Sequence, residues 1–239
     1  ALHIGSSSNS NYQGALQAQN VTFTSESDET NWEGIIINDF SDDAGTIIDS
    51  STIEKTIEKA IEIINSSPTI SNNDIVDNLD MGIYVEGSGS NPQIINNNFS
   101  KNLRAMYINP STSNYLVIGN TFTSNQYPLT LFPYALDGNV YGNTYSGNYL
   151  PDSTSSDFIW VYGDNGDEAH VRNGTYNWLA DGAPYRICTN LIYFGGNASS
   201  TSTLKLHPGT QLYFEEDRSL TIGRNDSNEW GSIEADSVL

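Results

Sequence analysis

Four stretches of this sequence repeat one another: Ile70–Asn78 (ISNNDIVDN), Ile94–Asn102 (IINNNFSKN), Val117–Asn125 (VIGNTFTSN) and Val140–Asn148 (VYGNTYSGN). The second begins 24 residues after the first, and each of the others begins 23 residues after its predecessor. Every copy holds an apolar pair, an Asn-rich corner and a second short apolar segment. Repeats of this length, built from strands of three to five residues, indicate a solenoid.

The remainder of each repeat also recurs, since Gly82–Val85 (GIYV) matches Ala105–Ile108 (AMYI) and then Pro128–Leu131 (PLTL). Stacked coils about 4.8 Å apart would place like residues in columns. The fold class predicted is therefore all-β: a right-handed, single-stranded parallel β-helix with about 22–24 residues per coil. One interior column is expected from Ile75, Phe99, Phe122 and Tyr145, and an asparagine ladder from Asn73, Asn97, Asn120 and Asn143.

Residues 52–64 support two interpretations. Ile53, Ile57, Ile61 and Ile64 follow helical spacing, as in an amphipathic helix. The segment also aligns with the next repeat at an offset of 22, so that Ile53 meets Ile75. No helix caps flank it clearly, and a helix would interrupt the stack. The strand interpretation is favoured.

The composition excludes several partners. Lys and Arg number 9 against 29 Asp and Glu, a formal net charge of -20, which would repel nucleic acid and anionic membrane surfaces. No apolar run reaches the roughly 20 residues that membrane insertion requires. A lone Cys188 excludes an internal disulfide, so packing and hydrogen bonds must hold the fold.

A longer repeat links the two ends. Leu2–Gly5 (LHIG) matches Leu220–Gly223 (LTIG) at an offset of 218, and Gly14–Ala18 (GALQA) matches Gly231–Ala235 (GSIEA) at 217. This predicts either tandem copies of one module within a longer chain or separate chains stacked head to tail. Matching ends of that kind generate fibres.

The Asn corners and the Gly-Asn-Thr-aromatic corner of residues 48–148 resemble the pectate-lyase-like right-handed parallel β-helix superfamily. The flanks resemble bacterial and archaeal surface β-helix proteins, on the segments Ala183–Ile187, Leu204–Phe214, Val21–Ser25 and Trp32–Ile35. The resemblance implies the fold and leaves function open, because this fold hosts lyases, hydrolases, adhesins and inert spacers.

Catalytic patterns known from the superfamily do not emerge. Lyases of that kind combine calcium-binding aspartates with a basic residue. Of the nine Lys and Arg residues here, Lys101 and Arg104 sit inside a repeat near a polar corner, and no Asp cluster is expected at one height in neighbouring coils. Glycosidases need paired carboxylates, and the one Asp-Asp pair, Asp42 and Asp43, is predicted to be a solvated turn. His3, His170 and His207 show no metal-ligand spacing.

The best metal candidate is a glycine-containing acidic loop. Asp164, Asp167 and Glu168 offer the hard oxygen ligands that calcium prefers. Their spacing fits no standard calcium loop, and a plain acidic turn is the alternative. No cofactor is required by the sequence, and calcium is the one ion that it suggests.

Aromatic residues concentrate beyond the regular repeats. Tyr149, Trp160, Tyr162 and Trp178 are candidates for carbohydrate contact, from a region in which residues 152–157 read as an inserted loop. The alternative is that these rings pack beneath the loop.

The sequence thus favours a single β-helix module over residues 1–239, with regular coils at about 47–148, looped coils at about 149–218, and residues 219–239 repeating the phase of 1–22. We expect a non-catalytic structural or adhesive module, extracellular or on the cell surface, with copies of itself or adjacent modules as partners. The alternatives are a polysaccharide-active lyase or hydrolase and a non-catalytic carbohydrate-binding module.

Overall fold

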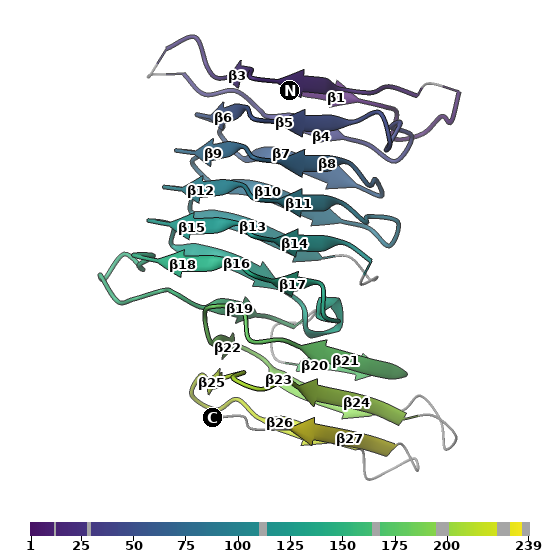
Figure 1. Cartoon of the computed structure of the whole chain (residues 1–239), viewed down its shortest axis with the longest axis vertical. Coiled ribbons are helices and arrows are strands. Elements are labelled where there is room, and N and C mark those ends of the chain that lie inside the picture. The colour runs from purple at the N-terminus through teal and green to yellow at the C-terminus, as the bar shows by residue number, and fades with distance from the viewer. Residues whose placement is uncertain are drawn as a thin grey trace.

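Short strands that alternate inward and outward side chains form a computed structural model in which every paired strand is parallel to its neighbours. The structure describes residues 1–11, 13–27, 30–109, 114–163, 168–194, 201–223 and 230–235. Successive coils stack along one axis, with β1 at one end and β27 at the other (Figure 1). The predicted right-handed parallel β-helix, of the pectate-lyase-like type, is confirmed.

One sheet runs the whole length of the stack. Its nine strands are, in spatial order, β1 (Leu2–Ile4), β4 (Ile35–Ile37), β7 (Lys59–Ile64), β10 (Met81–Glu86), β13 (Arg104–Asn109), β16 (Tyr127–Leu131), β19 (Ile159–Val161), β22 (Tyr185–Ile187) and β25 (Leu212–Phe214). We call it the long sheet.

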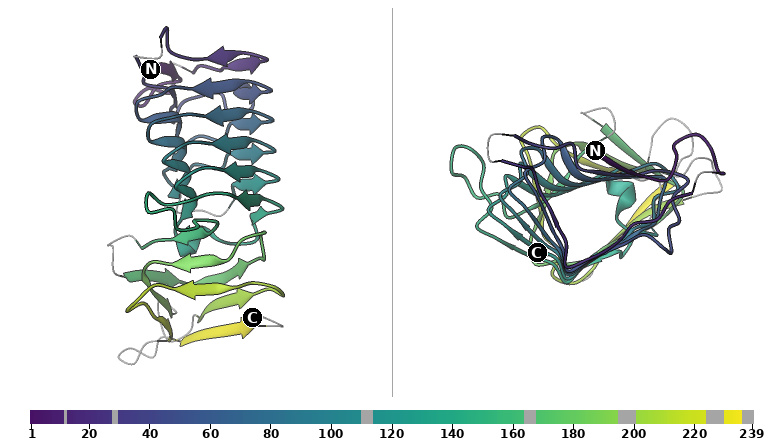
Figure 2. Two further views of the ribbon diagram at one scale, coloured as in Figure 1. Left: turned by 90° about the vertical axis from the view of Figure 1, so that its left-hand side faces the viewer. Right: turned by 90° about the horizontal axis from the view of Figure 1, so that it is seen from above.

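Two six-stranded sheets complete the three-sided coils of the first part (Figure 2). The first holds β2 (Gln17–Gln19), β5 (Ile47–Asp49), β8 (Thr69–Ser71), β11 (Gln93–Ile95), β14 (Leu116–Ile118) and β17 (Val140–Tyr141). The second holds β3 (Thr22–Phe23), β6 (Thr52–Glu54), β9 (Asp74–Val76), β12 (Asn98–Ser100), β15 (Thr121–Thr123) and β18 (Thr144–Ser146).

The last coils use different partners for the long sheet. One three-stranded sheet contains β20 (Glu168–Arg172), β23 (Asn190–Phe194) and β26 (Leu220–Ile222), and the other contains β21 (Gly174–Trp178), β24 (Thr201–Leu206) and β27 (Trp230–Ala235). In the described segments, one 3-10 turn, η1 (Pro133–Ala135), precedes β17. Among the described residues no helix is long and apolar enough to cross a membrane.

Residues 52–64 are strands β6 and β7, so the helix interpretation was wrong and the strand interpretation is confirmed. Ile53 pairs with Ile75, as the offset of 22 predicted. Ile53, Ile61 and Ile63 are fully buried, whereas Ile57 is 51% exposed at the corner between the strands. Ile61 and Ile63, two residues apart in β7, are buried, whereas Ile57 and Ile64 are not, so burial fits strand rather than helical spacing.

The interior column also forms as predicted. Phe99 pairs with Ile75 and Phe122, and Phe122 pairs with Tyr145. The three rings stack nearly parallel, with centroids 5.1 Å apart for Phe99 and Phe122 and 5.0 Å apart for Phe122 and Tyr145. Burial of such rings, with their stacking, is a main source of stability in the coils.

The predicted asparagine ladder joins the corners between the two six-stranded sheets. In Asn73, Asn97 and Asn120 the side-chain amide donates to Oδ1 of the ladder asparagine in the next coil, at 2.9–3.0 Å. The backbone N–H of each donates to the same oxygen. Corner backbone groups that no sheet can pair are thereby satisfied.

A second ladder, which sequence reasoning missed, runs along the next corner. It is formed by Asn78, Asn102, Asn125 and Asn148, with side-chain bonds of 2.9–3.1 Å. A residue of positive φ precedes ladder residues at both corners, as with Asn96 (56°) at the first corner and Gly147 (65°) at the second. Asn and Gly enter that left-handed region at least cost, which explains their abundance here.

Both ladders end at carboxylates. Asn143 donates to Asp181 and Asn148 donates to Asp157. At the other end, Oδ1 of Asn73 accepts from the Ser51 N–H, and Oδ1 of Asn78 accepts from the hydroxyl and N–H of Thr56. Every ladder bond between side chains therefore runs from an amide to an acceptor in the following coil, while the same amide also donates to a backbone carbonyl of an earlier coil, as Asn97 does to Ile70.

Candidate functional site

The outer face of the long sheet carries a column of side chains in strict register. Alternate residues of a strand face outward, so residues paired between strands share one row of the surface. The middle row contains, in spatial order, Glu62, Tyr84, Tyr107, Thr130, Trp160, Arg186 and Tyr213.

Aromatic rings gather around Trp160 in this row. Tyr127 and Phe158 meet the indole edge-on, with centroids 5.0 and 6.2 Å away, and Tyr162 is stacked on it at 6.4 Å. Together they leave Trp160 only 3% exposed although it stands on the outer face. Tyr162 is half-buried, and burial raises the pKa of its hydroxyl, so this phenol stays neutral.

Arg186 and Tyr213 extend the cluster toward the later coils. The Arg186 guanidinium lies 4.6 Å from the Trp160 ring centroid and 5.4 Å from that of Phe158, in cation–π contacts. Glu215 holds it in place through a 2.9 Å bond to Nε. Tyr213 is 54% exposed, and its ring meets Phe158 at 5.8 Å. We call Tyr127, Phe158, Trp160, Tyr162, Arg186 and Tyr213 the aromatic face.

Two polar atoms of this region have unmet hydrogen-bonding capacity. The indole nitrogen of Trp160 and the hydroxyl of Thr130, its register neighbour, are both buried, and neither has a hydrogen-bond partner among the described residues. Leaving such a group unpaired costs about 1–3 kcal/mol. An ordered water or a ligand oxygen is the usual partner for groups of this kind.

The structure brings together two of the four aromatic residues predicted to contact carbohydrate. Trp160 and Tyr162 belong to the aromatic face. Tyr149 is 51% exposed but lies elsewhere, in an isolated bridge with Ser155. Trp178 is fully buried against Tyr185, with ring centroids 4.9 Å apart. Its indole packs the core and offers no surface to a sugar.

Sequence reasoning missed the other members of the aromatic face. Tyr127, Phe158, Arg186 and Tyr213 come from four different coils. The signal that could have found them is the alternation of each strand, combined with the register between coils. That register is irregular here, because 30 residues separate Thr130 from Trp160 and 26 separate Trp160 from Arg186.

The predicted calcium loop lies largely outside the described residues, since Asp164 and Asp167 belong to the stretch 164–167. Glu168 begins β20, is exposed, and lies 3.2 Å from the His170 ring. The calcium site therefore stays a prediction.

Carboxylates of the described coils act as structural acceptors. Oδ1 of Asp43 accepts from the hydroxyls of Ser41 and Ser66 and from the N–H of Ser67, at 2.7–3.1 Å. It thus ties two coils together rather than forming the solvated turn that the sequence suggested. Asp49 similarly accepts from Ser71 in the next coil at 2.7 Å.

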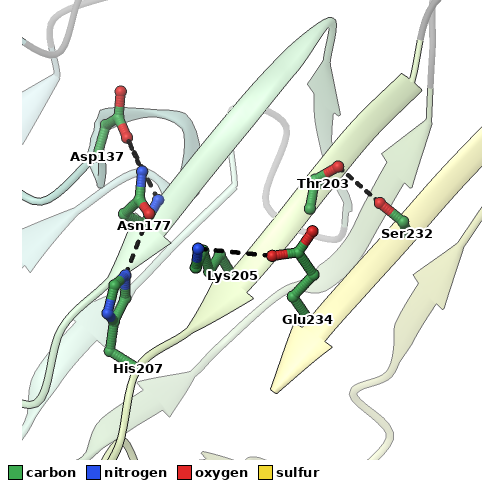
Figure 3. Close-up of polar contacts among 7 residues, drawn as sticks. All are labelled: Asp137, Asn177, Thr203, Lys205, His207, Ser232 and Glu234. Atoms are coloured by element: carbon green, nitrogen blue, oxygen red, sulfur yellow. Dashed lines mark hydrogen bonds and ion pairs between the residues drawn. The ribbon is translucent and has the colours of Figure 1, made fainter. Parts of the chain in front are cut away.

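Polar contacts also join the strands β21, β24 and β27 on their outer face (Figure 3). They pair His207 with Asn177, Lys205 with Glu234, and Thr203 with Ser232. Asn177 in turn donates to Asp137 at 2.7 Å, which links the last coils to the segment before β17. The histidine at position 207 is thus part of a coil-to-coil contact.

No metal-binding arrangement emerges from these side chains. Within the part of the chain that the structure describes, no three or more His, Cys, Asp or Glu side chains group closely enough to hold a metal ion. His3 lies on β1, His170 on β20, and His207 just after β24. Burial raises the pKa of the Cys188 thiol to about 12, so the thiolate that would bind a soft metal is not formed near neutral pH.

Comparison with known proteins gives one family. No curated protein and no solved structure matches the chain. The family described as "Periplasmic copper-binding protein (NosD)" matches residues 3–181, which is more than half of the chain and runs from β1 to the carboxylate that closes the first ladder. The chain therefore belongs to the NosD family of β-helix proteins.

Proposed function

We propose that this chain is a non-catalytic structural module that holds other parts of an envelope or cell-surface assembly at a fixed distance. The family is described as periplasmic, which supports a place outside the cytoplasm. The finer assignment, a spacer or adhesive rod at the cell surface, is our inference from the way the coils are held together.

The pair of asparagine ladders carries this proposal. They run along two corners through successive coils and end at Asp157 and Asp181, so each coil is bonded to the next through side chains as well as strands. The carboxylate oxygens of Asp43 and Asp49 accept similar bonds from serine hydroxyls of the next coil. Buried networks of this kind rigidify a fold. Stiffness along one axis is the property that a spacer needs.

Copper does not fit the described residues, although the family description names it. Copper prefers imidazole and sulfur ligands. The three histidines are dispersed, Cys188 is a buried neutral thiol, and Met106 is fully buried in the core. No step of the proposed function uses copper.

Two measurements test the proposal. Solution scattering and electron microscopy should show a stiff rod. Incubation with acidic and neutral polysaccharides should release neither new reducing ends nor unsaturated products. Release of either kind of product by the folded chain would establish a hydrolase or a lyase instead.

The aromatic face supports a second candidate, a non-catalytic carbohydrate-binding module. Its specific support is the unpaired indole N–H of Trp160 beside exposed and half-exposed rings. Aromatic side chains with an apolar face and a polar edge suit ligands that are themselves amphipathic. A sugar hydroxyl could accept from that indole only after a ring of the cluster moves aside.

Affinity electrophoresis, in gels that contain immobilised neutral polysaccharides, measures this binding and tests the candidate. Tyr213→Ala should weaken retardation several-fold, because Tyr213 is the most exposed ring of the aromatic face. Tyr141→Ala is the matched control, since Tyr141 is 41% exposed on a different sheet. Equal retardation of both variants and the parent would eliminate the candidate.

A further inference from the structure

The last described coil exposes residues that would be interior in any earlier coil. Leu204 of β24 is fully buried because Ile233 of β27 lies over it in register, whereas Ile233 itself is 46% exposed. On the neighbouring sheet, Leu191 and Tyr193 are fully buried beneath Leu220 and Ile222, which are only partly buried. The apolar columns thus continue to the surface of β26 and β27 without a covering coil among the described residues.

This coil repeats the local structure of the first one. Gly5 directly follows β1 with a φ of 73°, and Gly223 directly follows β26 with a φ of 79°. A Cβ on Gly14 would come within 2.9 Å of the Gly5 nitrogen, and a Cβ on Gly231 within 2.4 Å of the Gly223 nitrogen. The sequence match between the two segments is therefore also a match of backbone conformation, with the same close approach between two glycines.

The first coil shows which strand packs on a surface of this kind. Strand β4 lies on β1, with Leu2 beside Ile35, His3 beside Ile36 and Ile4 beside Ile37. The Ser41 backbone lies against Gly5 so closely that a Cβ there would be 2.5 Å from the Ser41 nitrogen. The glycines of the first coil thus make room for the coil that follows it.

We propose that β26 and β27 seat the second coil of another copy of this module, joined in the same chain. Residues 220–235 would then replace residues 2–18 of that copy. Leu220 would lie beside its Ile35, Thr221 beside its Ile36, and Ala235 beside its Ile48, following the pairs formed by Leu2, His3 and Ala18. This inference rests on the proposed spacer function and specifies its partner and register.

Joining in one chain is the arrangement that the register favours. In a separate copy, β4 is already covered by its own β1, and β5 by its own β2. A free copy would have to release those strands before β26 and β27 could take their place. A tandem copy whose first coil is supplied by residues 220–235 has nothing to release.

A joined chain tests the register by disulfide trapping. Residues 1–239 would be followed directly by residues 23–239 of a second copy, in a Cys188→Ala background. The test pair is Thr221→Cys in the first copy with Ile36→Cys in the second, since paired strand residues lie within the 4.4–6.8 Å range of Cα separations for a disulfide. The offset pair is Thr221→Cys with Glu62→Cys of the second copy, which lies one coil further along.

We expect near-complete oxidation of the test pair under mild oxidant and at least tenfold less of the offset pair. No disulfide in the test pair, or preferential bonding of the offset pair, would overturn the proposed register. If the joined chain is still a rod by solution scattering in that case, the spacer function survives. If neither the joined nor the single chain is elongated, the spacer function and the register both fail.

Discussion

Asp181 takes the place under Asn143 that a further ladder asparagine would occupy. Its Oδ1 accepts the Asn143 backbone N–H at 2.9 Å, and its Oδ2 accepts from the Asn143 side-chain amide at 2.8 Å. Oδ2 also accepts from the Tyr145 hydroxyl at 2.9 Å. A carboxylate can accept all three bonds. Unlike an asparagine amide, it has no N–H group that needs an acceptor in a following coil, which suits the last position of the ladder.

Asp181 should make stability depend on pH. Burial raises the pKa of this carboxyl above its ordinary value, and the bonds from Asn143 and Tyr145 oppose the shift. A group with a higher pKa in the folded chain binds protons more tightly when folded, so its contribution to stability is present in acid and declines as pH rises through the folded pKa. Asp181→Asn removes that titration.

The Asp181→Asn variant should therefore gain stability relative to the parent as pH rises from about 3.5 to 7. Urea unfolding of both proteins at several pH values measures the difference directly. A difference that stays constant with pH, or that shrinks as pH rises, would contradict the assignment.

Replacing a ladder asparagine should lower the free energy of unfolding far more than replacing the adjacent, exposed asparagine. Asn97→Ala leaves the Asn73 backbone N–H and side-chain amide without their shared acceptor. With each buried group worth about 1–3 kcal/mol, we expect a loss of about 2–4 kcal/mol in the free energy of unfolding. Asn98→Ala, whose side chain makes an exposed bond to Asp74, should cost about 0.5 kcal/mol. Denaturant titrations measure both variants. Similar losses for Asn97→Ala and Asn98→Ala would show that the ladder does not stabilise the fold.

The aromatic column offers a graded test of core packing. Phe122 lies between the rings of Phe99 and Tyr145. Phe122→Ala should lower the free energy of unfolding by about 3–5 kcal/mol, and Phe122→Leu, which keeps apolar volume but loses stacking, by about 1–2 kcal/mol. The two variants are compared by chemical denaturation. Equal losses would show that stacking contributes nothing beyond volume.

Two glycines of similar conformation separate steric conflict from backbone strain. Gly34 has a φ of 85°, and a Cβ there would lie 1.9 Å from the Lys59 carbonyl oxygen. Gly147 has a φ of 65° with nothing within 4 Å of its Cβ position. Gly147→Ala should cost about 1 kcal/mol, and Gly34→Ala at least about 3 kcal/mol, because β4 must move from β7. Thermal unfolding ranks the variants, and the reverse order would contradict this packing.

The regular coils could be predicted because like residues recur at nearly constant spacing. The column through Phe99 and the ladder through Asn97 follow from that recurrence alone. The ladder through Asn102 carried the same signal but was overlooked beside the first. Its closure by Asp157 could not be foreseen, because only 9 residues separate that carboxylate from Asn148, whereas ladder partners lie 23 or 24 residues apart.

The candidate site was harder to predict, because it lies where coil length varies. Trp160 and Tyr162 share one strand, so their proximity follows from alternation. Arg186 joins them only through a register between coils of unequal length, which no repeat indicates. Trp178 was predicted to contact carbohydrate but is buried in the core. Aromatic content alone does not distinguish a ring that faces solvent from one that faces the core.

The ladders give the rod a chemical direction. Every ladder amide is oriented the same way, from hydroxyl-bearing residues at Ser51 and Thr56 to carboxylates at Asp181 and Asp157. Because each internal asparagine donates to and accepts from an identical neighbour, one more 23-residue coil would leave both chemical endings unchanged. The length of such a molecule can therefore be altered one coil at a time, by duplication or deletion within the repeats, without redesigning its ends.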